Sequence, residues 1–198
     1  MAQYFDEIWF CDYAPSNLHA VKDWLDEKPN AFNWKPFFNH VLDIKQGHHD
    51  NEIEYEIKLR SVLKNSPIFR CDVNGENSLF IDNPSGDNRQ QEFDMIYSSS
   101  CLEAACSSYD IFKRTISRFS DILKPGGILL ICTFRNSTSY VFNGDKFTDL
   151  PLNKEIIQTA FVETGHLTEP VCFTLELKPD PAHHITDEGV MINYAFKK

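Results

Sequence analysis

The stretch YDIFKRTISRFSDILKPGGILLICTF, residues 109–134, lays out a helix, a turn and a strand in succession. Its apolar residues at the spacing of one helix face are Phe112, Ile116, Phe119 and Leu123. They predict a helix over residues 109–124, which KPGG at 124–127 brings to an end. The apolar run ILLICTF at 128–134 then predicts a fully buried strand, as in a parallel sheet covered by helices.

Towards the N-terminus, short apolar runs alternate with segments of helical spacing. The predicted strands cover residues 8–11, 67–71 and 93–97. The predicted helices are one from Pro15 with Leu18, Val21 and Leu25 on one face, one over 34–42, and one over 52–63 with Ile53, Ile57 and Leu59 inward. Residues 47–50 and the polar segment 74–91 are predicted loops.

Towards the C-terminus, Asn143-Gly144 within residues 140–147 signals a two-residue β-hairpin. Residues 153–164 predict a helix that Gly165 ends, and its inward side chains are Ile156, Ile157, Ala160 and Phe161. Residues 171–177 and 190–196 predict two strands that pair as an antiparallel hairpin across a longer loop.

This alternation of strands and helices predicts a doubly wound α/β sheet. In that fold, ligands bind at the carboxyl ends of the strands. With 198 residues the chain fits one domain, which we place over residues 1–198 with a hairpin insertion near 137–150.

The charge balance and the apolar pattern exclude several classes of protein. The chain has 19 basic and 29 acidic residues, a net charge of −10, which argues against binding to a nucleic-acid backbone. It has no run of about 18 apolar residues, so we expect no membrane span. The N-terminus has no basic segment and carries Asp6 and Glu7, so we expect a cytoplasmic protein without a secretory signal.

The cysteines and histidines do not form a metal-binding pattern. None of the six cysteines belongs to a CxxC pair, and we expect them to be small, buried, reduced side chains. The adjacent pairs His48-His49 and His183-His184 lie in predicted loops, where solvated side chains are expected. We therefore predict no metal site.

Two of the predicted strands end on an acid, Asp12 and Asp72. An acid in this position typically accepts hydrogen bonds from ribose hydroxyls, about 20 residues after a glycine-rich loop. Only eleven residues precede Asp12, and the first glycine of the chain is Gly47, so that loop is missing ahead of it. The alternatives are that Asp12 caps the following helix and that Asp72 merely starts a loop.

Several longer stretches carry a family resemblance. They are DYAPSNLHAVKDWLDEKPNAFNWKPFF (12–38), KLRSVLKNSPIFRCDV (58–73), SSSCLEAAC (98–106), LKPGGILLI (123–131), NSTSYVFNGDKFTDLPL (136–152) and EGVMINYAFKK (188–198). Together they resemble the nicotinamide, phenylethanolamine and indolethylamine N-methyltransferases, in order and over almost the whole chain.

The resemblance implies a Rossmann-like class I fold that uses S-adenosylmethionine to methylate a small amine or pyridine-type acceptor. The residues it matches to cofactor contacts are Asp12 at the ribose with its aromatic neighbour Tyr13, Asn17 in the lining of the cofactor pocket, Asp72 and Val73 beside the adenine, and Ser99 near the methionine end. Glu103 matches the acid that faces the acceptor, and Ser137 and Tyr140 lie in the hairpin that covers it. Glu103 is thus the expected catalytic residue, which orients the amine and takes up its proton.

Two departures from the family bear on this expectation. The sequence starts at the equivalent of the family's second strand, so we expect an N-terminally incomplete sheet with a gap where a central strand belongs. Cofactor binding should then be weakened. Thr133 also stands where the family carries an acid, which leaves the acceptor open.

Three hypotheses follow from the sequence. The chain is an incomplete small-molecule N-methyltransferase, or a catalytically inactive short paralogue that acts as a binding or regulatory protein, or, with less support, another nucleotide-binding α/β enzyme. We expect a monomer whose partner is a small molecule, with neither nucleic acid nor membrane involved.

Overall fold

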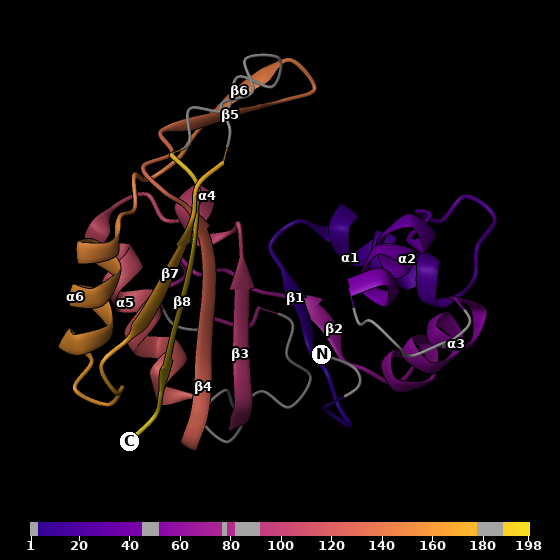
Figure 1. The fold of residues 1–198 in the computed structure, drawn as a ribbon, viewed down its shortest axis with the longest axis horizontal. Helices are drawn as coiled ribbons and strands as arrows, with labels where there is room; N and C mark the ends of the chain where they lie inside the picture. The colour runs from indigo at the N-terminus through magenta and orange to yellow at the C-terminus, as the bar shows by residue number, and fades with distance from the viewer. Residues whose placement is uncertain (1–3, 45–51, 77–78, 82–91, 178–187) are drawn as a thin grey trace. The chain divides into compact units, whose positions relative to one another are not determined.

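The structure is a computed structural model that describes residues 4–44, 52–76, 79–81, 92–177 and 188–198 (Figure 1). The chain divides into two compact units. The N-terminal unit is drawn from Met1–Asp72 and Phe80–Pro84, and the C-terminal unit from Val73–Leu79 and Ser85–Lys198. Each unit is described by itself. The predicted loop 47–50 and the pair His183-His184 lie outside the described residues, as does most of the loop 74–91.

The N-terminal unit combines a two-stranded parallel sheet with three helices. The strands are β1 (Phe10–Asp12) and β2 (Ile68–Arg70), in a register that pairs Phe10 with Ile68 and Asp12 with Arg70. The helices are α1 (Pro15–Leu25), α2 (Lys35–Ile44) and α3 (Glu52–Leu63). All five elements were predicted from short apolar runs and helical segments, and α1 begins on a proline.

The core of this unit forms around Trp24 and Leu63. Partly buried residues pack against them: Ile8, Phe10, Leu25, Ala31, Phe38, Leu59 and Val62. The prediction that Ile53 and Ile57 face inward was wrong, since both are more than half exposed. At 3.6 residues per turn, Ile57 lies nearly opposite Leu59 around the helix, so both cannot face one core.

The C-terminal unit contains a four-stranded sheet of order β3-β4-β8-β7 (Figure 1). Its strands are β3 (Phe93–Ser99), β4 (Leu123–Phe134), β8 (Val190–Phe196) and β7 (Val171–Leu175). β3 and β4 are parallel, whereas β8 runs antiparallel to both of its neighbours. The predicted C-terminal antiparallel pair is therefore confirmed.

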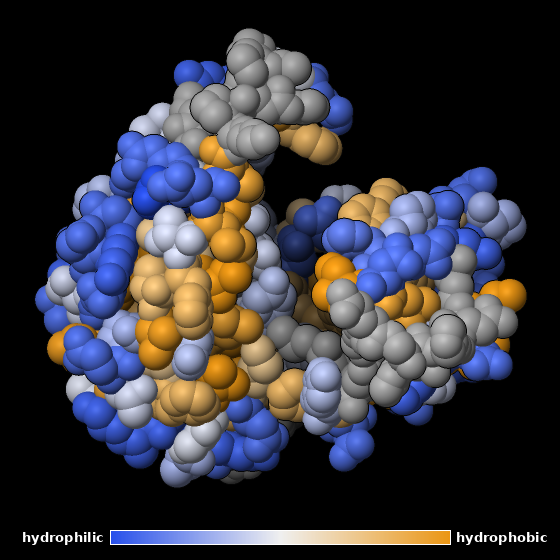
Figure 2. All heavy atoms as spheres, in the orientation of Figure 1, coloured by the Kyte–Doolittle hydropathy of each residue, from blue (hydrophilic) through white to orange (hydrophobic). Residues whose placement is uncertain are grey.

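Helices α5 (Tyr109–Asp121) and α6 (Lys154–Glu163) lie side by side along one face of this sheet (Figure 1). On that face Leu129 and Ile131 of β4 are fully buried, while Ile128 and Leu130 on the other face are only half-buried. The prediction of a fully buried strand over 128–134 was wrong in this respect. Val171, Phe173 and Leu175 of β7 are exposed apolar side chains. Figure 2 shows apolar surface over this unit as orange spheres.

The helix predicted over residues 109–124 ends three residues earlier, at Asp121. Leu123 belongs to β4 instead, where it pairs with Phe93 ahead of an irregularity in the register. The KPGG turn is thus the irregular beginning of the strand. Phe112, Ile116 and Leu123 are all fully buried, as their spacing predicted.

The two glycines of KPGG have different reasons to be glycine. A Cβ at Gly127 would lie 2.9 Å from the Lys124 carbonyl oxygen and 3.0 Å from that of Phe93, whereas Gly126 has open space but a φ of +78°. We expect Gly127→Ala to lower the free energy of unfolding by about 1–3 kcal/mol through overpacking. Gly126→Ala should cost about 1–2 kcal/mol through backbone strain. Urea unfolding of the two variants checks this, and a neutral Gly127→Ala would contradict it.

The remaining predicted elements of this unit are also present. The hairpin consists of β5 (Ser139–Phe142) and β6 (Asp145–Thr148), with Asn143 and Gly144 both at positive φ as its turn requires. Asn153 caps α6 by accepting from the Ile156 N–H, and Gly165 follows the helix at φ +71°. The short helix α4 (Leu102–Ala105) was not predicted.

Candidate functional site

The N-terminal unit gathers the predicted ribose and adenine acids at one edge of its sheet. Asp12 is the last residue of β1, and its carbonyl oxygen accepts from the Cys71 N–H at 3.0 Å. Asp72 follows Cys71 directly, beyond the end of β2. Because the two strands are parallel, both acids lie at their carboxyl ends, where an α/β sheet binds ligands.

The Asp12 carboxylate is fixed by two hydrogen bonds. Its Oδ1 accepts from the Ala14 N–H at 2.8 Å, and its Oδ2 accepts from the Asn17 Nδ2 at 3.0 Å. The N-cap of α1 is Ala14, so Asp12 holds the turn before the helix without capping it. A carboxylate has about four acceptor positions, so two remain for donors of a ligand. Asn17, predicted to line the same site, thus contacts Asp12 directly.

Tyr13 extends this edge with a mostly exposed ring, 62% accessible. The guanidinium of Arg70 lies over that ring, 5.6 Å from its centroid. Arg70 was not predicted as a site residue. Its only signal in the sequence is a basic residue near the end of the second predicted strand, and the structure pairs it with Asp12. Its Nε is closed off from solvent and has no hydrogen-bond partner among the described residues.

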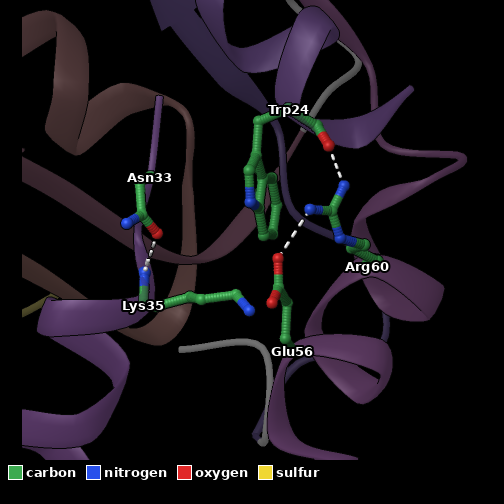
Figure 3. Close-up of polar contacts among 5 residues, drawn as sticks. All are labelled: Trp24, Asn33, Lys35, Glu56 and Arg60. Atoms are coloured by element: carbon green, nitrogen blue, oxygen red, sulfur yellow. Dashed lines mark hydrogen bonds and ion pairs between the residues drawn. The ribbon is translucent and has the colours of Figure 1, made fainter. Parts of the chain in front are cut away.

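Two other hollows of the N-terminal unit are of a different kind. One, of about 380 Å³, lies over α1 and β2 with a mostly apolar lining that excludes Asp12 and Asp72: Pro15, Leu18, His19, Lys22, Pro67, Ile68, Phe69 and Arg70. The other, of about 200 Å³, has Trp24, Lys35, Glu56 and Arg60 in its lining (Figure 3). There Arg60 stacks 4.3 Å over Trp24, donates to the Trp24 carbonyl oxygen and bonds Glu56 at 2.6 Å. These contacts join α1 to α3, so the role of this cluster is to hold the two helices together.

In the C-terminal unit, the two predicted cofactor residues differ in exposure. Val73 is buried, and its carbonyl oxygen accepts from the Thr115 hydroxyl of α5 at 3.1 Å. Ser99 ends β3 in an exposed position, paired in register with Cys132. Ser100 follows at a positive φ of +47°, so the chain turns sharply at the carboxyl end of the strand.

Glu103 lies in the first turn of α4 and is almost completely buried, at 2% exposure. Its Oε1 accepts from the backbone N–H of Phe134, at the end of β4, at 3.0 Å. Its own carbonyl oxygen accepts from the Leu150 N–H at 2.7 Å. Glu103 therefore joins α4 to the end of β4 and to the segment that follows the hairpin.

Ser137 lies next to this junction and is also buried, at 1% exposure. Its hydroxyl donates to Asp149 Oδ2 at 2.6 Å, and Asp149 is the residue before Leu150. The structure thus connects Glu103 and Ser137 through residues 149–150. Asp149 was missed in the sequence, where its only signal is an acid near the end of the predicted hairpin insertion at 137–150.

Tyr140 occupies a different environment. It lies on the exposed hairpin, is 40% accessible and stacks on Phe147 with ring centroids 5.1 Å apart. It does not share the buried hydrogen bonds of Glu103 and Ser137.

All six cysteines are free, but the expectation that they are buried was only partly right. Cys106 is buried, and burial raises the pKa of its thiol to about 12. Cys11 and Cys101 are exposed, and Cys71, Cys132 and Cys172 are partly buried. Within the described ranges, no helix is long and apolar enough to cross a membrane.

Solved structures with similar folds are S-adenosylmethionine-dependent methyltransferases. One from Methanosarcina mazei aligns with 96% of this chain and 82% of its own, with a TM-score of 0.57 and 10% identity. The glycopeptide N-methyltransferase MtfA, solved with S-adenosylhomocysteine, aligns with 95% of this chain and 72% of its own, with a TM-score of 0.52 and 9% identity. These likenesses show the fold, which is the class I methyltransferase fold that was expected.

Curated relatives match in sequence as well. Human nicotinamide N-methyltransferase is 33% identical over 83% of this chain and 59% of its own length. Mouse indolethylamine N-methyltransferase is 29% identical over 81% and 58%, and bovine phenylethanolamine N-methyltransferase is 28% identical over 98% and 66%. The chain therefore spans about three fifths of the length of these relatives. The model of the NNMT/PNMT/TEMT family matches residues 1–198, and the chain belongs to that family.

Proposed function

We propose that this protein transfers a methyl group from S-adenosylmethionine to the nitrogen of a small amine or pyridine-type acceptor. The observation that carries the proposal is the Asp12 carboxylate, fixed by Ala14 and Asn17 at the carboxyl end of β1 with acceptor positions to spare. Membership of the family supports it, since the similar proteins are N-methyltransferases of small molecules by name.

The residues proposed to hold the cofactor have separate tasks. Asp12 accepts from the ribose hydroxyls, with Tyr13 and Asn17 beside it. Asp72 and Val73 contact the adenine, and Ser99 contacts the methionine end. Asp12 and Asp72 fit these tasks because both end parallel strands at one edge. We take both units as parts of one methyltransferase domain, since one family model spans residues 1–198.

When bound, S-adenosylmethionine supplies an activated methyl group whose sulfonium is a good leaving group. The chain then has to position the acceptor nitrogen, exclude water and remove a proton. Glu103 is proposed to orient the acceptor and take up its proton, with Ser137 and Tyr140 as further acceptor contacts. A carboxylate 2% exposed strengthens such an interaction, because little water competes for it.

We also propose that the 198-residue chain alone binds the cofactor weakly, and that an N-terminal segment from a relative restores binding. Residues 1–46 contain no glycine, so they hold no glycine-rich loop ahead of or around Asp12. The chain with such a segment is called the completed chain below. The net charge of −10 and the free cysteines favour a cytoplasmic, monomeric protein.

In the completed chain, Asp12→Ala should weaken binding of S-adenosylhomocysteine at least about tenfold. A hydrogen bond to a charged group contributes about 1.5–3 kcal/mol, and even one lost bond gives this factor. Calorimetric titration measures the change. The matched control is Asp26→Ala, which removes an exposed acid at the end of α1. Equal affinities for wild type and Asp12→Ala would leave Asp12 as a turn-stabilising residue only.

A further inference from the structure

We propose that Asp149 is a second acceptor-site carboxylate, which together with Glu103 selects a cationic amine over a neutral acceptor. The inference rests on the proposed function and narrows its substrate class. It starts from the partly buried hydrogen bond between Ser137 Oγ and Asp149 Oδ2, 2.6 Å long, at the base of the β5–β6 hairpin.

The position of Asp149 relates it to Glu103. The Asp149 N–H donates to the Thr138 carbonyl oxygen at 2.9 Å, which closes the hairpin base. The next residue, Leu150, donates to the Glu103 carbonyl oxygen at 2.7 Å. The two acids therefore belong to neighbouring segments at the carboxyl end of β4, where Glu103 binds the Phe134 N–H.

The two oxygens of Asp149 are used differently. Oδ2 accepts from Ser137, which is enough to hold the hairpin base together. Oδ1 is closed off from solvent and has no hydrogen-bond partner among the described residues. Leaving a charged oxygen buried without a donor is unfavourable, so a ligand that brings an N–H would stabilise it.

The nearby polar groups leave that role to a ligand. Arg135, two residues before Ser137, is engaged by Glu188, whose carbonyl oxygen it contacts at 2.6 Å and whose Oε2 lies 3.4 Å from its Nε. Thr133 is 1% exposed, and its Oγ1 has no partner within the described part of the chain. Two carboxylates and a hydroxyl match an ammonium group, which has three donors and a positive charge.

The test is ligand titration of the 198-residue chain, followed by ¹H–¹⁵N NMR. The probes are 2-phenylethylamine, which is cationic at neutral pH, and its neutral counterpart 2-phenylethanol. We expect the amine to bind at least about tenfold more tightly, as for one charge-assisted hydrogen bond. Asp149→Asn keeps the size of the side chain and an acceptor for Ser137, and should reduce the preference to about twofold or less.

A matched variant separates the Asp149 charge from the charge of the hairpin as a whole. Asp145→Asn removes an exposed acid of the same hairpin and should keep the preference. An unchanged preference in Asp149→Asn, or an equal loss in Asp145→Asn, overturns the role of Asp149 while amine binding and the proposed function stand. A wild-type chain that does not prefer the amine also overturns the role of Asp149, whereas the proposed function fails only if the completed chain methylates no acceptor.

Discussion

Glu103→Gln is expected to lower the turnover of the completed chain by about 10²–10⁴-fold, the range of a lost acid–base group. The amide oxygen of glutamine can still accept from the Phe134 N–H, so the junction between α4 and β4 should persist. What the variant loses is the capacity to take a proton from the acceptor nitrogen. Affinity for S-adenosylhomocysteine should not change, because none of the proposed cofactor residues is altered.

Steady-state kinetics with primary amines, indolethylamines and pyridines measures this effect. Glu155→Gln is the control, because Glu155 is an exposed first-turn acid of α6 in the same unit. Both substitutions remove an acid whose charge is favourable at a helix N-terminus. Only Glu103→Gln changes a buried side chain. Equal rate constants for the two variants on every substrate would make Glu103 a structural residue.

The 198-residue chain on its own is expected to bind S-adenosylmethionine about 30- to 150-fold more weakly than the completed chain. Backbone N–H groups of a glycine-rich loop would contribute two or three hydrogen bonds of about 1 kcal/mol each, and residues 1–46 contain no glycine to form it. In the described residues β1 pairs only with β2, and β3 pairs only with β4. Each of these two strands therefore has one edge without a neighbouring strand, to which an added strand could pair.

Calorimetric titration of both chains to millimolar cofactor gives the ratio directly. Circular dichroism of the shorter chain serves as the control, since weak binding is informative only if the chain is folded. A micromolar dissociation constant for the 198-residue chain would contradict the expectation and show that its own residues suffice.

Local spacing predicted most of the fold. The Asn143-Gly144 turn, the end of α6 at Gly165 and the buried side chains of α5 depend on neighbours within a few residues, so the sequence alone predicts them. The sequence alone did not show which faces of the helices and strands are covered by other elements. Ile57 looked like a core residue because it is apolar, but core position depends on what packs against α3.

The sequence also predicted where some of the candidate site residues lie in the fold. Asp12 and Asp72 end strands, and pairing of those strands as parallel neighbours brings them to one edge. Asp149 and Arg70 were not predicted as candidates because their contacts form across the fold, one with Ser137 and the other with Tyr13. Such contacts follow from tertiary packing and leave no periodic signal.

The most direct test of the proposed function is transfer of a labelled methyl group by the completed chain. S-adenosylmethionine carrying a ¹³C-methyl group is incubated with the amine and pyridine panel, and the products are identified by mass spectrometry. We predict a labelled methyl group on the nitrogen of at least one acceptor, greatly reduced in Glu103→Gln. A completed chain that is folded and binds the cofactor, yet methylates no acceptor, would contradict the account and favour an inactive paralogue that acts by binding.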